Sequence, residues 1–453
     1  MRCSLIRVII QSATEESDMS AHHQGSFSQF LIVWTGQMVS AIGSGLSAFT
    51  MCVYAFQTTH LATSYALIML WGFLPQFLLT PIGGVLADRF DRRLLIVIAD
   101  CGGAAGVLFI LFMMSIGHIQ LWQIYLGVAI SSIFVAVHAP AYKASITDFL
   151  PADDFAKASG LIQLASSAQF LLSPLIAGIL MGFLDIRYVL FIDIMTYVFA
   201  IITVIIVRRQ MVPFAARQAP ARFFDELREG FQATVTNKGI RWLIGITALV
   251  LFYIGLLQAL LGPMILSFTN VRTMGIAQSV CAIGMLVSSL LIGVVGGKKH
   301  LVTILSCSLG LMGLFFSLLG LTTNIILFVI PGFLFFFVIP FVNMSIDLLI
   351  RNNIDNSKQG RVWSFVSIIT YSGLVIAFLG AGFLADHVFN PLFLLHGALA
   401  DSFLGRLVGT GPGRGIAFVF VMSGLGVLIL AFFVFRSKEI KGLETQPISA
   451  TQQ

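Results

Sequence analysis

The chain has 453 residues, of which 58% are hydrophobic and only 10% are charged, and its formal net charge is +6. A soluble protein carries about 25% charged residues, so this composition excludes a water-soluble globular protein. A helix of about 20 apolar residues crosses the ~30 Å apolar layer of a bilayer, and such runs recur along the sequence. The composition therefore predicts an all-α membrane protein with many spans.

The N-terminal segment, residues 1–28, is polar and irregular apart from the short run CSLIRVII at 3–10. That run is too short for a secretory signal peptide, and the polar stretch QSATEESD follows it. We therefore expect residues 1–28 to form a cytoplasmic tail. Met19 offers a second translation start, and the sequence leaves open whether translation begins there or at Met1.

Apolar runs bounded by charged or turn residues predict twelve transmembrane helices in two halves of six. The first half covers residues 29–207, the second covers 240–435, and a polar linker at 208–239 separates them. Residues 436–453 are predicted to form a cytoplasmic C-terminal tail. The predicted helix centres lie near residues 42, 75, 104, 130, 170, 198, 252, 286, 311, 337, 373 and 426.

The distribution of Lys and Arg predicts the orientation of these spans. If both termini are cytoplasmic, all Lys and Arg residues but four fall in inner segments. The four that fall in outer loops are Arg187, Arg272, Arg406 and Arg414. Inner loops of membrane proteins carry an excess of Lys and Arg, which the anionic inner leaflet attracts. We therefore expect a multi-pass protein of the cytoplasmic membrane, and nucleic acid is not needed to explain the basic balance.

The linker at 208–239 contains an apolar stripe. In RFFDELREGFQATV, residues Phe223, Leu227, Phe231 and Val235 recur at intervals of four among charged residues. This spacing predicts an amphipathic helix that lies in the membrane interface or against the inner ends of the spans. A helix that binds a regulatory partner has the same pattern, so that alternative stays open.

The two predicted halves show a weak internal repeat. The turn GGVLADRFDRRLLIV at 83–97 follows the second span, and the turn IGVVGGKKHLVTI at 292–304 follows the eighth. Each combines small residues with a tight basic turn before the next apolar run. Carriers that work by alternating access are commonly built from such repeats around a site near the middle of the membrane.

The turn at 83–93 concentrates charge in a chain that has little of it. Its glycines allow another helix to approach closely, and Asp88 can accept hydrogen bonds from the N-terminus of a neighbouring helix. We therefore predict a conformational latch, with a plain positive-inside anchor as the alternative. The predicted latch residues are Gly84, Asp88, Arg89, Arg92 and Arg93.

The pattern G-x-x-x-D-R-x-x-R-R at 84–93 resembles motif A of the major facilitator superfamily. Further stretches resemble the macrolide-efflux-type drug:proton antiporters of that superfamily, in the same order along the chain. They include WTGQMVSAIGS, HAPAYKASITDFLP, SPLIAGIL, NKGIRWL and GRVWSF. The resemblance implies the major facilitator fold and export of hydrophobic or amphipathic, drug-like compounds in exchange for protons.

The same branch includes siderophore exporters and lysophospholipid transporters, so the substrate stays open. A membrane receptor or scaffold that does not transport is a further alternative. The predicted partners are a small substrate, protons and membrane lipids, and we expect a monomer. We expect no enzyme activity, cofactor or metal, because GTGPGRG at 409–415 lacks the ending of a phosphate-binding loop and His22-His23 lack further ligands.

Ionisable residues inside the predicted spans are the candidates for proton coupling, because such residues are costly in a membrane and need a reason to persist. Asp193 lies in the sixth span, followed by Tyr197. Asp100 and His138 lie at similar depths in the third and fourth spans, so they can form a pair that titrates near neutral pH. For each of these groups a structural contact is the alternative.

The family resemblance implies that the first, fourth, seventh and tenth spans line the substrate path. The run FLFFFVIPF at 333–341 offers an apolar wall in the tenth span, which suits a lipophilic substrate. The candidate cavity residues near the midpoints of these spans are Gln37, Ser40, Ser131, Tyr253, Gln258 and Asn343.

Overall fold

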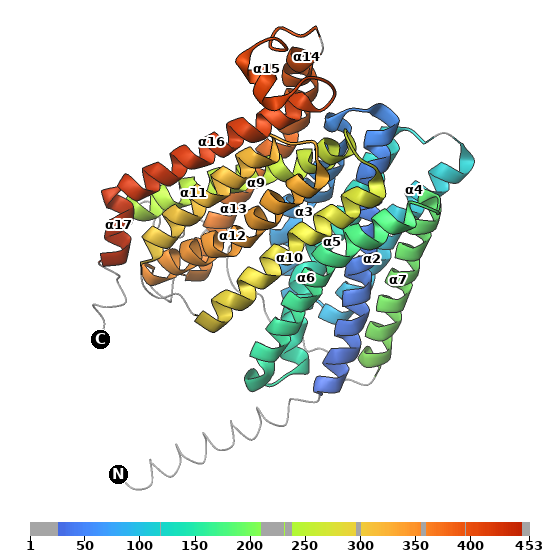
Figure 1. Ribbon diagram of the computed structural model, residues 1–453. Coiled ribbons are helices and arrows are strands. Elements are labelled where there is room, and N and C mark those ends of the chain that lie inside the picture. The colour runs from blue at the N-terminus through green and yellow to red at the C-terminus, as the bar shows by residue number, and fades with distance from the viewer. Residues whose placement is uncertain are drawn as a thin grey trace, which may run out of the picture.

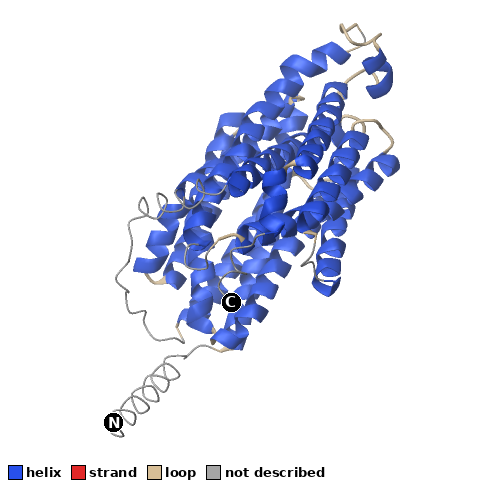
Figure 2. Ribbon diagram, turned by 90° about the vertical axis from the view of Figure 1, so that its left-hand side faces the viewer, coloured by secondary structure: helices blue, strands red, loops and turns tan. Residues whose placement is uncertain are grey.

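A computed structural model describes residues 26–117, 119–209, 231, 238–295, 300–354, 359–394 and 396–445. Within these ranges every regular element is a helix (Figure 2). Twelve of the described helices are long and apolar enough to cross a membrane. The predicted fold class, an all-α membrane protein with twelve spans, is therefore confirmed.

The spans follow the predicted order, and each predicted centre falls within one of them. The first six are α2 (Phe27–Thr59), α3 (Ala62–Arg89), α4 (Arg92–Ile116), α5 (Leu121–Phe149), α6 (Phe155–Leu180) and α7 (Ile186–Arg208). The second six are α9 (Lys238–Leu266), α10 (Val271–Val295), α11 (Leu301–Leu319), α12 (Ile325–Asn352), α13 (Gln359–Phe383) and α16 (Arg414–Arg436). The short elements are η1 (Ala152–Asp154), η3 (Leu384–Phe389), α14 (Asn390–Phe393), α15 (Phe403–Val408) and α17 (Lys438–Thr445).

Because the number of spans is even, α2 begins and α16 ends on the same side of the membrane. We call this the tail side and the opposite side the far side. The short helices α14 and α15 lie beyond the ends of the long helices on the far side (Figure 1). Of the predicted linker at 208–239, most residues lie outside the described part of the chain, and so do residues 1–25.

Local side-chain caps mark where several helices begin. The Ser26 side chain accepts a hydrogen bond from Gln29 N, and the Gln29 side chain accepts one from Ser26 N. Asp91 caps α4, and Asp185 caps α7 through the backbone N–H of Arg187. Such caps satisfy backbone N–H groups that the first helical turn leaves without partners.

The predicted C-terminal tail contains the helix α17, which binds to the tail side of the second half. Glu444 accepts hydrogen bonds from Leu301 N (3.0 Å) and Val302 N (3.4 Å), so it caps the start of α11. Asn353, just after α12, donates to the carbonyl of Leu443 at 2.9 Å. Helix α17 therefore joins the ends of two spans.

The two halves contact each other closely in the part of the membrane nearest the far side. Ser279 of α10 donates to the carbonyl of Leu171 in α6 at 2.6 Å. Next to this bond, a Cβ atom on Gly275 would collide with the backbone of Pro174. A small residue is thus required for the close approach of these two helices, as is usual where helices pack inside a bilayer.

A cluster of aromatic rings joins the halves near the middle of the membrane. Phe73 of α3 makes edge-to-face contacts with Tyr371 and Phe378 of α13, at centroid distances of 5.7 Å and 6.2 Å. Phe77 contacts the ring of Tyr371 at 6.2 Å. Such ring pairs stabilise packing beyond the area they bury. Together with the α6–α10 contact, this aromatic cluster closes the molecule toward the far side.

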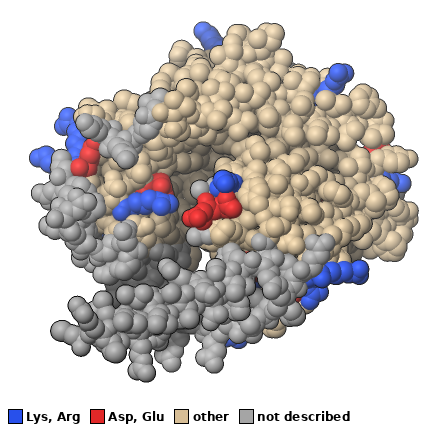
Figure 3. Space-filling view, turned by 90° about the horizontal axis from the view of Figure 1, so that it is seen from below, with Lys and Arg blue, Asp and Glu red and all other residues tan. Residues whose placement is uncertain are grey.

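The tail side is open at the corresponding position. Asp88, near the tail end of α3, is exposed, and a Cβ on Gly84 would have no atom within 4 Å. Figure 3, which looks onto the lower face of Figure 1, shows a hollow with charged side chains at its margin. The structure is therefore that of a molecule closed on the far side and open on the tail side.

Candidate functional site

A cavity of about 400 Å³ lies in the first half, mainly between α2, α4, α5 and α6. Its walls include Met38, Ala41, Val135, Ile162 and Ala165, which are apolar. Its polar lining comprises Gln37, Ser40, Ser44, Gln76, Asp100, His138, Tyr142, Lys143, Ser166, Gln169 and Tyr197. Asp100 lies two turns from the tail-side start of α4. The cavity thus lies in the tail half of the membrane.

Three side chains from three helices form a hydrogen-bond network in the cavity wall. Gln37 Nε2 donates to Asp100 Oδ2 at 2.9 Å, and Gln37 Oε1 lies 2.8 Å from His138 Nε2. The same His138 nitrogen lies 3.5 Å from Asp100 Oδ1. The structure therefore brings together the predicted Asp100–His138 pair and joins it through Gln37.

The members of this network differ in their contact with the cavity. Asp100 and Gln37 are 3% and 7% exposed, whereas the His138 side chain is 23% exposed. The His138 ring also stacks on Tyr142, with centroids 5.9 Å apart. The His138 side chain is thus partly open to the cavity, while the Asp100 carboxyl group is almost fully covered.

Asp193 lies deeper, toward the far side, and is completely buried. Its Oδ1 is 3.5 Å from Ser44 Oγ and 3.4 Å from Thr196 Oγ1. Its Oδ2 has no hydrogen-bond partner in the described part of the chain. Ser44 Oγ also donates to the Tyr197 hydroxyl at 2.9 Å. Since a serine has one hydroxyl proton, Ser44 can serve only one of these acceptors at a time.

Ser44 and Tyr197 lie between the two buried acids. Both line the cavity, and Ser44 contacts Asp193 directly. The Tyr197 hydroxyl lies against Gly103, one turn along α4 from Asp100. Two carboxyl groups at different depths are thus separated by two hydroxyl groups at the cavity wall.

The charged turn between α3 and α4 is bonded mainly to its own half. Asp91 caps α4 by accepting from Arg93 N at 3.0 Å, and it pairs with Arg208 of α7 at 3.0 Å. Asp88, which the sequence predicts to accept hydrogen bonds from the N-terminus of a neighbouring helix, has no bond to any described residue in this conformation. The acid that caps here is therefore Asp91, which directly precedes the helix, as N-cap residues do.

The predicted latch arginines also bind within the first half. Arg92 Nη1 lies 2.8 Å from Asp148 Oδ1 and donates to the carbonyl of Ala144 at 2.9 Å. Arg93 is buried, and its guanidinium lies 5.6 Å from the centroid of the Phe149 ring. These contacts fix the turn to the tail end of α5. Arg89 is exposed at the end of α3.

Of the six candidate cavity residues, Gln37 and Ser40 line the cavity. Ser131 instead donates to the carbonyl of Gly103 at 2.9 Å, between α5 and α4. The other three belong to the second half and do not line this cavity: the Tyr253 hydroxyl packs against Gly426, Gln258 is half-buried and Asn343 is exposed.

Sequence reasoning missed the cavity residue Gln169 of α6. Its signal was a lone amide side chain within the run SSAQFLL, where a polar group needs a partner or a water-filled space. Lys143, exposed near the tail end of α5, also lines the cavity and was missed.

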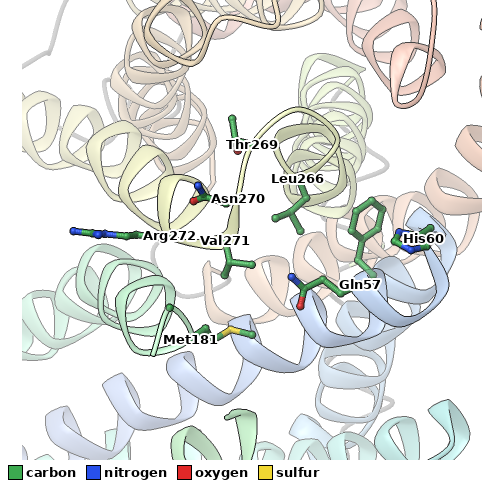
Figure 4. A pocket seen from close by; sticks show the side chains of 10 residues that line it. Gln57, His60, Met181, Leu266, Thr269, Asn270, Val271 and Arg272 are labelled. Atoms are coloured by element: carbon green, nitrogen blue, oxygen red, sulfur yellow. The ribbon is translucent and has the colours of Figure 1, made fainter. Parts of the chain in front are cut away.

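A second cavity, of about 610 Å³, lies at the far side between α2, α6, α9 and α10. Gln57 of α2 and His60, just after α2, face Leu266 and Val271 of the second half across it, while Arg272 points away from the other side chains (Figure 4). It lies at the boundary of the halves, where the far side is closed.

The family model of the Major Facilitator Superfamily matches residues 33–378. The chain belongs to this superfamily. It is therefore a multi-pass membrane protein and a secondary transporter of a small substrate, and not an enzyme. The charged turn at 84–93 and the network at Asp100 both lie inside the matched range.

Relatives in this superfamily include efflux proteins. Macrolide efflux protein A of Streptococcus pyogenes is 27% identical over 376 residues, which cover 82% of this chain and 93% of that protein. The uncharacterized MFS-type transporter YfiS of Bacillus subtilis is 24% identical, over 80% of this chain and 88% of that protein.

Solved structures share the fold at low sequence identity. The POT family transporter PepTSo superposes with a TM-score of 0.72 at 10% identity, over 92% of this chain and 99% of that one. A bacterial homolog of the human lysosomal transporter Spinster, in an inward-facing and unoccupied conformation, gives a TM-score of 0.67 at 15% identity, over 92% and 99%.

Proposed function

We propose that this transporter exports hydrophobic or amphipathic small molecules from the cytoplasm in exchange for protons. The observation that carries the proposal is the cavity beside Asp100, which combines apolar walls with a few polar groups. Apolar area binds a lipophilic substrate, and a few polar groups fix its orientation. The similarity to macrolide efflux proteins supports the same substrate class.

We assign the tail side to the cytoplasm. The loops on that side hold most of the Lys and Arg residues, and an excess of these residues is typical of cytoplasmic loops. With this orientation the open cavity receives substrate from the cytoplasm or from the inner leaflet. Both termini are then cytoplasmic, as the sequence predicts.

The network of Gln37, Asp100 and His138 is the proposed site of proton coupling. A second proton on His138 turns its 3.5 Å contact with Asp100 into an ion pair. Gln37 and His138 both line the cavity, so a substrate that bonds to either of them competes with the internal hydrogen bonds. Substrate binding then favours release of the proton toward the tail side.

The test is the export of a fluorescent lipophilic compound, and of a macrolide, from efflux-deficient cells with and without a protonophore. We expect Asp100→Asn to reduce protonophore-sensitive export about tenfold or more, since a hydrogen bond to a charged group contributes about 1.5–3 kcal/mol. Asp154→Asn is the matched control, because Asp154 pairs with exposed Lys157 at the tail end of α6, away from the cavity.

Unchanged, protonophore-sensitive export by Asp100→Asn would remove this network from the coupling mechanism. If the unmodified protein exports no lipophilic compound, the proposed substrate class is wrong. Siderophores and lysophospholipids are the substrates to test next in the same assay. If nothing is transported, the alternative of a receptor or scaffold is favoured.

Asp193 is the second proposed proton site, and the same assay separates its two interpretations. If Asp193 exchanges a proton with the Ser44–Tyr197 pair, Asp193→Asn flattens the dependence of export on external pH. If Asp193 only anchors α7 to α2 through Ser44, export falls without a change in the shape of that dependence.

We also propose that the turn at 84–93 is a conformational latch. Its arginines hold the turn to α5, while Asp88 is left exposed on the side where the halves are apart. When the tail side closes, Asp88 becomes available to the backbone N–H groups at the start of α13, which favour an anion.

A further inference from the structure

A five-residue pattern occurs at both ends of the interface between α3 and α13. Residues 84–88 at the tail end of α3 read GVLAD, and residues 382–386, which run from the far end of α13 into η3, read GFLAD. Both follow the form G-x-L-A-D. The two helices belong to different halves, contact each other and run in opposite directions. The same pattern therefore stands at opposite membrane sides of one helix pair.

At the far side this pattern makes a bonded contact between the halves. Asp386 Oδ1 accepts from Ala62 N at 3.0 Å, and Oδ2 accepts from Thr63 N and Thr63 Oγ1, both at 2.7 Å. Leu61, the residue before α3, supplies no side-chain cap of its own. The first turn of α3 is thus capped by a carboxylate that lies more than 300 residues away in the chain.

The glycine of the far-side pattern is necessary for this contact. A Cβ on Gly382 would collide with the backbone of Thr63. Positions four apart lie on the same face of a helix, so the glycine admits the partner helix where the aspartate binds it. The helix also changes to π-helical geometry at Leu384–Phe389, a rare deviation that is frequent at functional positions.

At the tail side no partner helix contacts the described residues of the same pattern. A Cβ on Gly84 would meet no atom within 4 Å, and Asp88 is exposed with no bond to any described residue. One end of the α3–α13 pair is therefore closed through its G-x-L-A-D pattern, and the other end is open.

We propose that Asp386 and Gly382 form a far-side clasp with the start of α3, a counterpart to the tail-side latch at Asp88. The far-side clasp stabilises the conformation that is open to the tail side, and it must break before the far side opens. The two acids then act in alternation, each capping the N-terminus of the helix that carries the other. This inference rests on the latch proposed for Asp88.

The clasp is tested by pulsed electron–electron double resonance, which measures the distance between two spin labels. The labels are attached to cysteines introduced into a full chain without its native cysteines, in lipid nanodiscs. Labels at Thr58 and Arg272 report the far side, and labels at Ser159 and Ser289 report the tail side. All four positions are exposed. We expect Asp386→Ala to increase the ratio of far-side-open to tail-side-open molecules about tenfold, since each lost hydrogen bond involves a charged acceptor.

Matched variants keep the test decisive. Asp185→Ala removes a far-side helix cap within one half, and it should leave both distance distributions unchanged. Gly382→Ala should open the far side by collision with Thr63, whereas Gly380→Ala, which meets no atom within 4 Å, should not. If Asp386→Ala fails to fold, the comparison of Gly382→Ala with Gly380→Ala still tests the far-side clasp.

The outcomes separate the clasp from the proposed latch. Asp88→Ala should shift the same ratio in the opposite direction. If Asp88→Ala shifts the ratio but Asp386→Ala and Gly382→Ala do not, the far-side clasp is wrong and the latch stands. If the Asp386 and Gly382 variants shift this ratio and Asp88→Ala does not, the proposed latch at Asp88 is wrong. The two acids then do not act in alternation.

Discussion

The Arg92–Asp148 ion pair should contribute more to stability than any other charge contact of the turn at 84–93. Arg92 Nη1 lies 2.8 Å from Asp148 Oδ1, and the two side chains are only 11% and 19% exposed. The same nitrogen donates to Ala144 O at 2.9 Å. Arg92→Ala therefore leaves a largely buried carboxylate without its closest cation and frees the tail end of α5 from the turn.

The size of the expected loss in unfolding free energy follows from how far the Arg92–Asp148 pair is buried. Removing one partner of a fully buried ion pair costs about 3–5 kcal/mol, and an exposed pair contributes about 0–1 kcal/mol. Because both side chains retain some contact with solvent, we expect Arg92→Ala to lower the free energy of unfolding by about 2–3 kcal/mol. Adding Asp148→Asn should restore part of this loss, since the uncompensated charge is then gone.

Equilibrium unfolding in mixed micelles of dodecyl sulfate and dodecyl maltoside measures the effect. Arg208→Ala is the control, because its pair with Asp91 has exposures of 44% and 23% and should contribute about 1 kcal/mol or less. Equal losses for Arg92→Ala and Arg208→Ala would refute the argument from burial. Equal losses for Arg92→Ala and the double variant would show that the Asp148 carboxylate costs nothing when it is left without its cation.

Two further predictions concern acidic residues on the tail side of the molecule. Asp88→Asn should leave membrane insertion and unfolding free energy unchanged while impairing export, and normal export would reject the latch. Glu444→Gln should weaken the cap on Leu301 and Val302 and make trypsin cleave within α17 about fivefold faster, as a contribution of about 1 kcal/mol implies. Glu439→Gln, which changes a carboxylate that is bonded to Ser437 and not to the start of α11, should not; equal rates would mean that the cap does not hold α17.

The spans were predictable because they depend on local composition. About 20 consecutive apolar residues suffice to identify a membrane-spanning helix, whatever that helix packs against. The meeting of Asp100 and His138 was predictable for a related reason. Each lies a countable number of turns from a helix end, and consecutive helices run in opposite directions, so depth in the membrane could be read from the sequence.

Side-chain direction was less predictable than depth. Ser131 and His138 lie in the same helix, yet Ser131 bonds to α4 while His138 lines the cavity. The difference depends on the rotation of α5 about its axis and on which helices surround it, and packing across the whole half determines both. Gln37 was predicted as a cavity residue, but its bonds to Asp100 and His138 needed the positions of three helices at once.

The contacts of Asp386 with the first half also could not be predicted from the sequence. Its partners at Ala62 and Thr63 lie more than 300 residues earlier, so no local pattern predicts them. The repeated G-x-L-A-D sequence was visible, but its meaning depends on α3 and α13 being antiparallel neighbours. Without that arrangement, GFLAD reads as the apolar end of a span followed by a polar residue.

The contacts of the turn at 84–93 fit the conformational latch that we propose for it. A latch can shift the balance between two conformations only if its own half moves as a unit, because a flexible attachment would absorb the change. Asp91 and Arg92 bind the turn to α7 and α5 of the same half, and in the proposed mechanism these contacts persist when the halves move. Asp88 has no such bond to a described residue, and we propose that it binds the other half. Substitutions at Arg92 should therefore weaken the fold in every state, and substitutions at Asp88 should change only the ratio of states.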